Sequence, residues 1–412
     1  MVLRWLATKD FPANLLPKGP DRAFVQDLVY TVVRRLRPLR KVLGSLVKIW
    51  PKGELEALLY VGAAQILYMN EVPDYAAVNE TVEAAKACPN PNVAKVVNGV
   101  LHNLIRRRSE FEAMLSAAPL EERESFPTEL VRRWTARFGA ESAEKLCRWH
   151  NTPAETWLAR KDGSFVVLER GKRVADVDGY ATGDFIVQDP ATALAVELLA
   201  PQPDECVLDA CAAPGGKTIQ LAWRGAKVTA CEVNPKRRRR LEENLARVGL
   251  SDKVVVGDSL ALGQRTSPSV DVLGQRTSPS VDMLGQRMSS SVESSTHHPV
   301  SFPKILVDAP CSNTGVLRRR PDARWNWSTE KLAALTALQA EILESAARLC
   351  APGGKIVYST CSNEPEENQL QVRRFLAAHP EFTLEAERES IPFESAHDGA
   401  YACLLELKPT SS

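Results

Sequence analysis

Apolar residues recur at helical spacing near the start of the chain. Phe24, Leu28, Val32 and Leu36 are each four residues apart, which places them on one face of a helix. Similar apolar patterning recurs in three later segments, residues 55–62, 77–87 and 93–105. The last of these ends in three arginines, Arg106 to Arg108, which suit the carboxyl end of a helix. The pattern predicts an all-helical region from residue 21 to about 115.

A different pattern begins at Thr192, where short apolar runs alternate with helical stretches. This alternation predicts a Rossmann-like α/β domain with a doubly wound sheet. Residues 382–387 and 401–407 predict a closing antiparallel pair. The five runs expected to form the other strands are Cys206–Asp209, Val228–Cys231, Val254–Val256, Ile305–Val307 and Ile356–Tyr358.

The segment between these regions has mixed character. Residues 127–147 predict two short helices, and Phe165 to Leu168 predict a strand. We therefore expect three parts: an all-α domain over residues 1–115, a small α+β connecting region over 116–185, and the α/β domain over 186–412.

A tandem repeat interrupts the α/β pattern. The sequence LGQRTSPSVDV begins at Leu262, returns almost unchanged at Leu273, and starts again at Leu284, a period of 11 residues. The repeat is rich in Ser, Gly and Pro and has too few apolar side chains to offset the entropy of ordering it. We predict a disordered insertion over residues 259–300, and the alternative is a lid over the active site.

Composition narrows the class of protein. No run approaches 18 apolar residues, and the first 20 residues lack an apolar signal core, so we expect no membrane span and no secretion. The nine cysteines include no C-x-x-C pair and the six histidines are dispersed, which argues against a metal site and a disulfide framework. A cytoplasmic protein fits these features.

Positive charge is clustered although the net charge is only +1. Such runs are commonly solvated helix faces. Four clusters in a neutral chain nonetheless favour one face that follows phosphates. The clusters lie within residues 34–41, 106–108, 236–240 and 318–320.

The first expected βα turn of the α/β domain is rich in glycine and small residues. It follows the run Cys206–Asp209 and allows a ligand to approach the backbone and the next helix N-terminus. Its spacing matches neither the dinucleotide-binding nor the triphosphate-binding glycine motif. A ligand with a sugar and an amino acid part fits better. The candidate cofactor-binding residues of this turn are Cys211, Ala212, Ala213, Pro214, Gly215, Gly216 and Lys217.

Acidic residues follow three more of the expected strands. Glu232 stands where a ribose would lie, Asp258 where an adenine edge would lie, and Asp308 follows the fourth strand. An isolated acid after a strand is commonly a helix N-cap. Three such acids beside a glycine-rich first turn favour S-adenosylmethionine as the cofactor.

Two cysteines follow expected strands and suggest covalent catalysis. Methyltransferases that act on exocyclic amines tend to carry Asn/Asp-Pro-Pro-aromatic at the fourth strand, whereas this chain has Asp308-Ala309-Pro310-Cys311. A thiol there points to a carbon target, since C5 of a pyrimidine accepts a methyl group only after a nucleophile adds to C6. Cys361 follows the fifth strand. Spacing alone leaves open which of the two thiols attacks.

Three stretches resemble the Sun/Fmu (RsmB-type) family of RNA cytosine-5 methyltransferases: DACAAPGGKT, VDAPCSNTGVLRRRPDARW and YSTCSNEPEEN. Residues 21–108 are similar to that family's NusB-like helical RNA-binding domain. The resemblance covers nearly the whole chain. It implies a methyltransferase that uses S-adenosylmethionine to modify a cytosine, with small-subunit ribosomal RNA as the expected substrate.

The resemblance also implies residue roles. Cys361 would be the nucleophile, Cys311 would assist product release, and Asp308 would lie near the methionine end of the cofactor and the target cytosine. Glu232 would hold the ribose, where the family more often has Asp, and Asp258 would contact adenine. The turn from Cys211 to Lys217 would line the cofactor site.

The sequence departs from the family between residues 151 and 184, which are shorter than usual and put RNA docking in doubt. Two alternatives remain: the same chemistry on another RNA such as transfer RNA, and a non-catalytic RNA-binding assembly factor. The presence of both thiols argues against the second. We expect a monomer.

Overall fold

The computed structural model describes residues 1–409 except residues 10, 18, 170 and 258–300. Asp258 and the predicted insertion at 259–300 therefore lie outside the described residues. Contacts divide the chain into two compact units. The helical unit comprises residues 1–154 and 316–327, and the sheet unit comprises residues 155–315 and 328–412.

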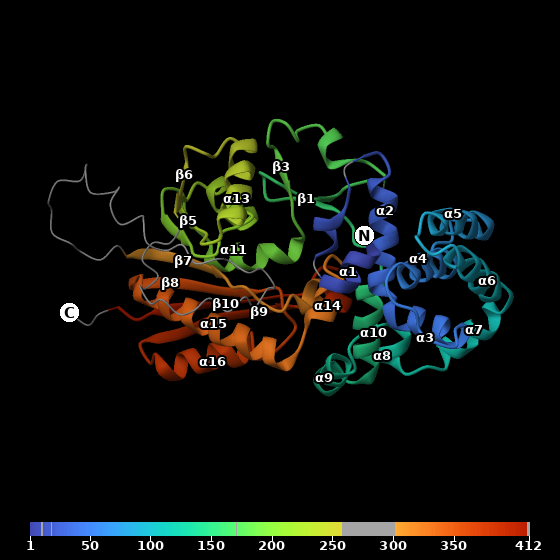
Figure 1. Cartoon of the computed structure of the whole chain (residues 1–412). Coiled ribbons are helices and arrows are strands. Elements are labelled where there is room, and N and C mark those ends of the chain that lie inside the picture. Colours follow the sequence, from blue (N-terminus) through green and yellow to red (C-terminus); the bar gives the residue numbers. More distant parts are fainter. Residues whose placement is uncertain (10, 18, 170, 258–300, 410–412) are drawn as a thin grey trace. The chain divides into compact units, whose positions relative to one another are not determined.

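The helical unit is built from helices of moderate length (Figure 1). Their apolar positions recur every three to four residues, as expected from the sequence. Its α-helices are α1 (Val2–Thr8), α2 (Arg22–Arg34), α3 (Leu36–Leu46), α4 (Glu54–Tyr68), α5 (Asp74–Lys86), α6 (Asn92–Arg106), α7 (Arg108–Ser116), α8 (Leu120–Arg123), α9 (Thr128–Phe138), α10 (Ala140–Asn151) and the short α14 (Ala323–Asn326).

Helix α4 is the centre of this unit. It is apolar around most of its circumference and packs against α1, α2, α3, α5 and α6. Gly62 allows the close approach of α6, because a Cβ at this position would lie 2.5 Å from Cδ1 of Leu101. A helix buried on nearly all sides needs such apolar residues in every direction.

The segment 316–327 returns the chain from the sheet unit to the helical unit. Arg324 is wholly buried there, with its guanidinium 3.8 Å from the centre of the Phe126 ring. It donates hydrogen bonds to the Ser125 carbonyl (3.2 Å) and to Oδ1 of Asn151 (2.9 Å). A buried cation with these partners fixes the segment to the helical unit.

The first part of the sheet unit is a small antiparallel sheet of order β2-β1-β3. Its strands are β1 (Trp157–Arg160), β2 (Phe165–Val167) and β3 (Phe185–Val187). The predicted connecting region is thus shared between the two units, with helices α8–α10 in the helical unit and these strands in the sheet unit.

The main sheet has the order β6-β5-β4-β7-β8-β10-β9. The first five strands run parallel, and β10 is antiparallel to both β8 and β9. The predicted Rossmann-like α/β fold and its closing antiparallel pair are confirmed. The strands are β4 (Cys206–Asp209), β5 (Lys227–Cys231), β6 (Val254–Gly257), β7 (Phe302–Asp308), β8 (Cys350–Thr360), β9 (Phe382–Ser390) and β10 (Ala400–Leu407).

Alternate residues of each strand enter two separate cores, as strand geometry requires. Val207 packs with helices α11 to α13, whereas its neighbour Leu208 packs with α15 and α16. The sheet is therefore covered by helices on both faces (Figure 1). The helices of this unit are α11 (Ala193–Leu199), α12 (Gly216–Trp223), α13 (Pro235–Arg247), α15 (Thr329–Arg348), α16 (Gln369–Ala378) and α17 (Pro392–Ser395).

The strand order changes direction beside β4. The chain continues from β4 to β5 on one side, while β7 lies on the other side. Open α/β sheets bind ligands at the carboxyl ends of strands beside such a switch point. Asp209 ends β4 and Asp308 ends β7, so both carboxylates are placed at this point. Within the described residues, no helix is long and apolar enough to span a membrane.

Candidate active site

The turn between β4 and α12 has a backbone that requires glycine. Gly215 has a φ of 108°, in the left-handed region that disfavours side chains. A Cβ at Gly216 would lie 3.1 Å from the Gln188 side chain, so the turn also runs close to its neighbours. The predicted residues Cys211 to Lys217 thus lie together between β4 and the N-terminus of α12.

Helix α13 supports this turn from the side. Arg237 donates a 2.8 Å hydrogen bond to the Ala213 carbonyl, and Asn244 donates one of 2.8 Å to the Pro214 carbonyl. The Arg237 guanidinium also lies 3.4 Å from Oε2 of Glu232. Glu232 is buried just after β5, where its Oε1 accepts from the Asn234 amide. Arg237 therefore connects Glu232, the predicted ribose-binding acid, to the turn that is predicted to bind the cofactor.

Asp209 is a functional candidate that sequence reasoning missed. Its Oδ2 accepts a 2.7 Å hydrogen bond from the Thr218 hydroxyl, whereas Oδ1 is buried without a hydrogen-bond partner in the described part of the chain. Burial raises the pKa of Asp209 to about 6. A buried acceptor of this kind suits a donor supplied by a ligand. Its position within the DACAAPGGKT motif was the available signal.

Lys217 and Asp308 form an ion pair with a distance of 2.6 Å between Nζ and Oδ2. Ser359 donates a 2.9 Å hydrogen bond to the other carboxylate oxygen of Asp308. Burial alone would lower the pKa of Lys217, but the charge of Asp308 and its hydrogen bond outweigh burial and raise that pKa. The ammonium group therefore stays charged at the ends of β4 and β7.

The two predicted cysteines lie side by side. The Sγ atoms of Cys311 and Cys361 are 3.2 Å apart, and Cys361 Sγ is 3.4 Å from Oδ1 of Asn313. The hydrogen bond with Cys361, burial and nearby negative charge raise the pKa of Cys311 well above its ordinary value. Cys311 therefore keeps its proton and can donate it in a hydrogen bond to the sulfur of Cys361.

A buried carboxylate links the two cysteine loops. Glu367 is wholly buried and accepts hydrogen bonds from the Ser312 amide (2.8 Å), from the Ser312 hydroxyl and from the Ser362 hydroxyl. Gln339 of α15 donates a further hydrogen bond of 3.0 Å. Sequence reasoning did not single out Glu367, although it lies inside the YSTCSNEPEEN motif.

Gly315, in the loop that follows Cys311, lies against the backbone of two other segments, the Cys361 loop and Gly399 before β10. A Cβ at Gly315 would lie 2.7 Å from the Gly399 carbonyl oxygen and 2.9 Å from that of Cys361. The Gly315 amide donates to the Cys361 carbonyl at 3.0 Å. This hydrogen bond and the close backbone contacts hold the Cys361 loop beside the Cys311 loop.

These features suit the cofactor predicted from the sequence. The glycine turn lets a ligand approach the backbone, Oδ1 of Asp209 is available to accept a hydrogen bond from a ligand, and the buried Glu232 stands after the neighbouring strand. Together with the strand order, they define an S-adenosylmethionine-dependent methyltransferase. A family model described as 16S rRNA methyltransferase RsmB/F matches residues 196–401, and a NusB family model matches residues 6–106. The chain belongs to this RsmB/F methyltransferase family.

Individual relatives support the same assignment. A ribosomal RNA small subunit methyltransferase B from Vibrio cholerae is 32% identical over 423 residues, which cover 93% of this chain and 89% of that protein. The enzyme of the same name from Cronobacter sakazakii is 33% identical over 393 residues, which cover 89% and 84%. The crystal structure of PH0851 shares the fold, with a TM-score of 0.71, 24% identity and coverage of 93% and 90%.

The enzyme class, the cofactor and the family predicted from the sequence are thus confirmed. The structure brings together the turn from Cys211 to Lys217 with Asp308, and it pairs Cys311 with Cys361. Glu232 joins them through Arg237 and the Ala213 carbonyl. The roles of these residues stay predictions, and Asp258 lies outside the described residues.

Proposed function

We propose that this protein methylates C5 of a cytosine in small-subunit ribosomal RNA through a covalent bond between Cys361 and C6 of the base. The observation that carries this proposal is the pair of sulfurs 3.2 Å apart, beside the Lys217–Asp308 ion pair. The relatives named above are ribosomal RNA small subunit methyltransferases, which supports the choice of substrate.

Cys361 attacks as a thiolate. A hydrogen bond from the protonated Cys311 and the positive charge of Lys217 both favour the negative sulfur. Attack forms the S–C6 bond and moves the C5–C6 π electrons into the ring, which makes C5 nucleophilic. N3 takes up a proton from the solvent as the displaced electrons reach it, and Asp308 stabilises that proton. S-adenosylmethionine, when bound, supplies the methyl group.

Release reverses the covalent step. A base from the solvent takes the C5 proton, the C5–C6 double bond forms again, and the S–C6 bond breaks, returning its electron pair to the Cys361 sulfur while the N3 proton returns to the solvent. Cys311 lies next to this sulfur and assists the departure of the methylated base. The two thiols therefore have separate tasks, attack for Cys361 and release for Cys311.

The target base must leave its stack to reach a thiol at the end of a strand. Unpaired loops and assembly intermediates of the ribosomal RNA offer such bases. We place the enzyme in the cytoplasm and infer that it acts as a monomer. The NusB-type helical unit would hold the RNA through its phosphates.

Mapping of the modification tests the proposal. Purified protein and S-adenosylmethionine are incubated with unmodified small-subunit ribosomal RNA and, separately, with transfer RNA, and 5-methylcytosine is located by bisulfite sequencing. We expect one or a few modified cytosines in the ribosomal RNA and none with Cys361→Ala. Modification of transfer RNA alone would move the substrate, and no modification of either RNA would overturn the proposed activity.

A further inference from the structure

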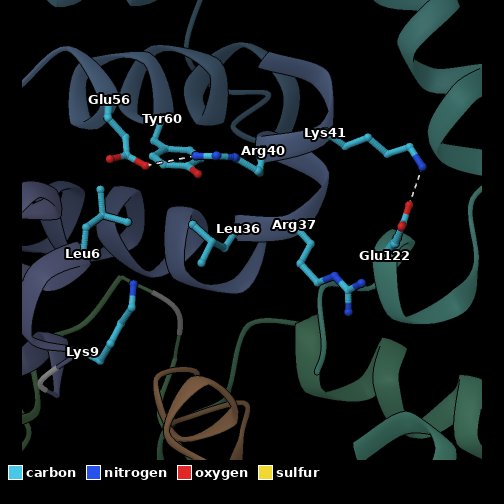
Figure 2. A pocket seen from close by; sticks show the side chains of 9 residues that line it. All are labelled: Leu6, Lys9, Leu36, Arg37, Arg40, Lys41, Glu56, Tyr60 and Glu122. Carbon is cyan, nitrogen blue, oxygen red and sulfur yellow. Dashed lines mark hydrogen bonds and ion pairs between the residues drawn. The ribbon is translucent and has the colours of Figure 1, made fainter. Parts of the chain in front are cut away.

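The helical unit contains a pocket that is lined by none of the active-site residues described above. It has a volume of about 530 Å³ and lies among α1, α3, α4 and α8. Figure 2 shows the side chains that line it, with Leu6 and Lys9 on one side and Lys41 and Glu122 on the other. The volume falls in the range of pockets that hold small organic ligands.

Positive charge dominates the lining of this pocket. Arg37, Arg40 and Lys41 are three and four residues apart on α3 and so share one face of that helix. Lys9, at the carboxyl end of α1, is a fourth cation. The acidic lining residues are Glu56 and Glu122, so the pocket carries an excess of two positive charges.

Two of the four cations form ion pairs with acids within the described residues, and the other two feel the same acids at longer range, Arg37 that of Glu122 and Lys9 that of Glu56. Arg40 lies 3.4 Å from Oε1 of Glu56, and Lys41 pairs with Glu122. Arg37 instead donates to the neutral hydroxyl of Thr128 at 3.1 Å and to a backbone carbonyl.

Lys9 is the second cation that forms no ion pair in the described part of the chain, although the charge of Glu56 acts on it. Its ammonium lies 4.2 Å from the centre of the Trp5 ring, and burial lowers its pKa. Cations that outnumber the acids in a recess repel one another and lose hydration, and a bound anion offsets both effects.

The pocket also has an apolar part. Leu6 and Leu36 contribute aliphatic side chains, and Tyr60 contributes an aromatic ring. Burial raises the pKa of the Tyr60 hydroxyl to about 12, so this hydroxyl is neutral. An inorganic phosphate would make no favourable contact with these apolar side chains. A nucleotide combines a phosphate with a flat base and suits both parts of the lining.

We propose that this pocket binds one nucleotide of a single-stranded segment of the RNA substrate, with Arg37 at its phosphate, Lys9 and Lys41 on opposite sides of the pocket, and the base against Leu6 and Leu36. This inference rests on the proposed function, since it takes RNA as the anion. It adds a phosphate-binding site within the helical unit, made of residues other than those that carry out methyl transfer.

The first test measures binding of a fluorescein-labelled single-stranded oligoribonucleotide by anisotropy at several salt concentrations. The double variant Lys9→Gln, Lys41→Gln is compared with Arg132→Gln, Lys145→Gln, which removes two exposed cations from the same unit. The pocket variant should bind more weakly, and its slope of log K against log salt should be shallower by about 0.7 for each phosphate that it no longer neutralises. The control should match the wild type.

A third variant separates charge from damage to the fold. Glu122→Gln removes one of the two acids and raises the positive excess of the pocket, so RNA should bind more tightly and with a steeper salt slope. A structural defect would not strengthen binding. Thermal unfolding of each variant confirms that it is folded. The inference is overturned if the pocket variants bind RNA like the wild type, or if Glu122→Gln weakens binding.

The result of the RNA-binding test can be distinguished from the result of the methylation test of the proposed function. RNA binding is measured without S-adenosylmethionine, so it does not depend on methyl transfer. A wild-type protein that methylates RNA while the pocket variants bind normally refutes the pocket alone. Weakened binding of the pocket variants, in a protein that methylates neither RNA, refutes the proposed activity alone.

Discussion

Cys311 and Cys361 lie in different surroundings, because Cys311 is buried and Cys361 is partly exposed. The sequence predicts that both thiols follow strands, because a short run of apolar residues precedes each of them. It does not predict that the sulfurs lie 3.2 Å apart. That distance depends on how two loops fold, and Glu367 binds residues from both loops. Hydrogen bonds between segments 50 residues apart leave no periodic signal in a sequence.

Glu367 is expected to position the two cysteines. In Glu367→Gln, the remaining oxygen can still accept from the Ser312 amide, but an NH2 group replaces the oxygen that accepts from the hydroxyls of Ser312 and Ser362. The loops should shift slightly, and we expect a fall in kcat of about 10²-fold with an unchanged KM for S-adenosylmethionine. Steady-state methyl transfer measures both constants.

The matched control for this change is Glu341→Gln, an exposed glutamate of α15. It should leave kcat and KM at wild-type values. A rise in the KM for S-adenosylmethionine with kcat preserved in Glu367→Gln would place the carboxylate in the cofactor site instead and would contradict a positioning role.

Asp209 is expected to make stability depend on pH. Burial raises its pKa to about 6, whereas an unfolded chain has an aspartate pKa of about 3.9. The folded state then binds the proton more tightly. The stability that Asp209 contributes is therefore fully present below about pH 4 and is lost as the pH rises through about 6.

Asp209→Asn should remove the loss of stability that the wild type suffers as the pH rises through about 6. Relative to the wild type, the free energy of unfolding of the variant should rise between pH 4 and pH 8 by at most about 3 kcal/mol. Urea unfolding at the two pH values measures the difference. A difference that stays the same at both pH values would show that Asp209 does not titrate in this range.

At the scale of elements, the sequence predicts the strands and helices well because each carries its own period of apolar residues. The strand Cys206–Asp209 has the predicted bounds, and the antiparallel pairing of β9 with β10 follows from adjacent runs at the end of the chain. The close backbone contact of Gly315 with Gly399 is not predictable in this way, because each glycine matters only through the other's backbone.

Gly315→Ala tests that contact. Its new methyl group would meet two backbone carbonyl oxygens, which cannot move as a side chain does. We expect a decrease of about 1–3 kcal/mol in the free energy of unfolding and a large decrease in methyl transfer. Thermal or urea unfolding and an activity assay measure the two effects.

Gly44→Ala is the reference for this substitution. Gly44 lies in α3 with open space around its Cα, so alanine there should be neutral or slightly stabilising. Equal effects of the two substitutions would show that the loops at Gly315 have room to separate.

At the scale of the molecule, the division into units differs from the order of the sequence motifs. The motif VDAPCSNTGVLRRRPDARW reads as one stretch, yet its second half lies in the helical unit. Arg318, expected within a basic cluster that follows phosphates, is buried with its guanidinium 4.1 Å from the Trp149 ring. A run of arginines predicts charge but not burial, because the partners that bury it are far away in the sequence.

The proposed mechanism depends above all on the division of labour between the two thiols. It is tested by incubating Cys311→Ala and Cys361→Ala with unmodified small-subunit ribosomal RNA and S-adenosylmethionine, then separating the products on a denaturing gel. We expect a stable protein–RNA adduct with Cys311→Ala, because attack proceeds and release fails, and no adduct with Cys361→Ala. An adduct that forms with Cys361→Ala and not with Cys311→Ala would contradict this mechanism.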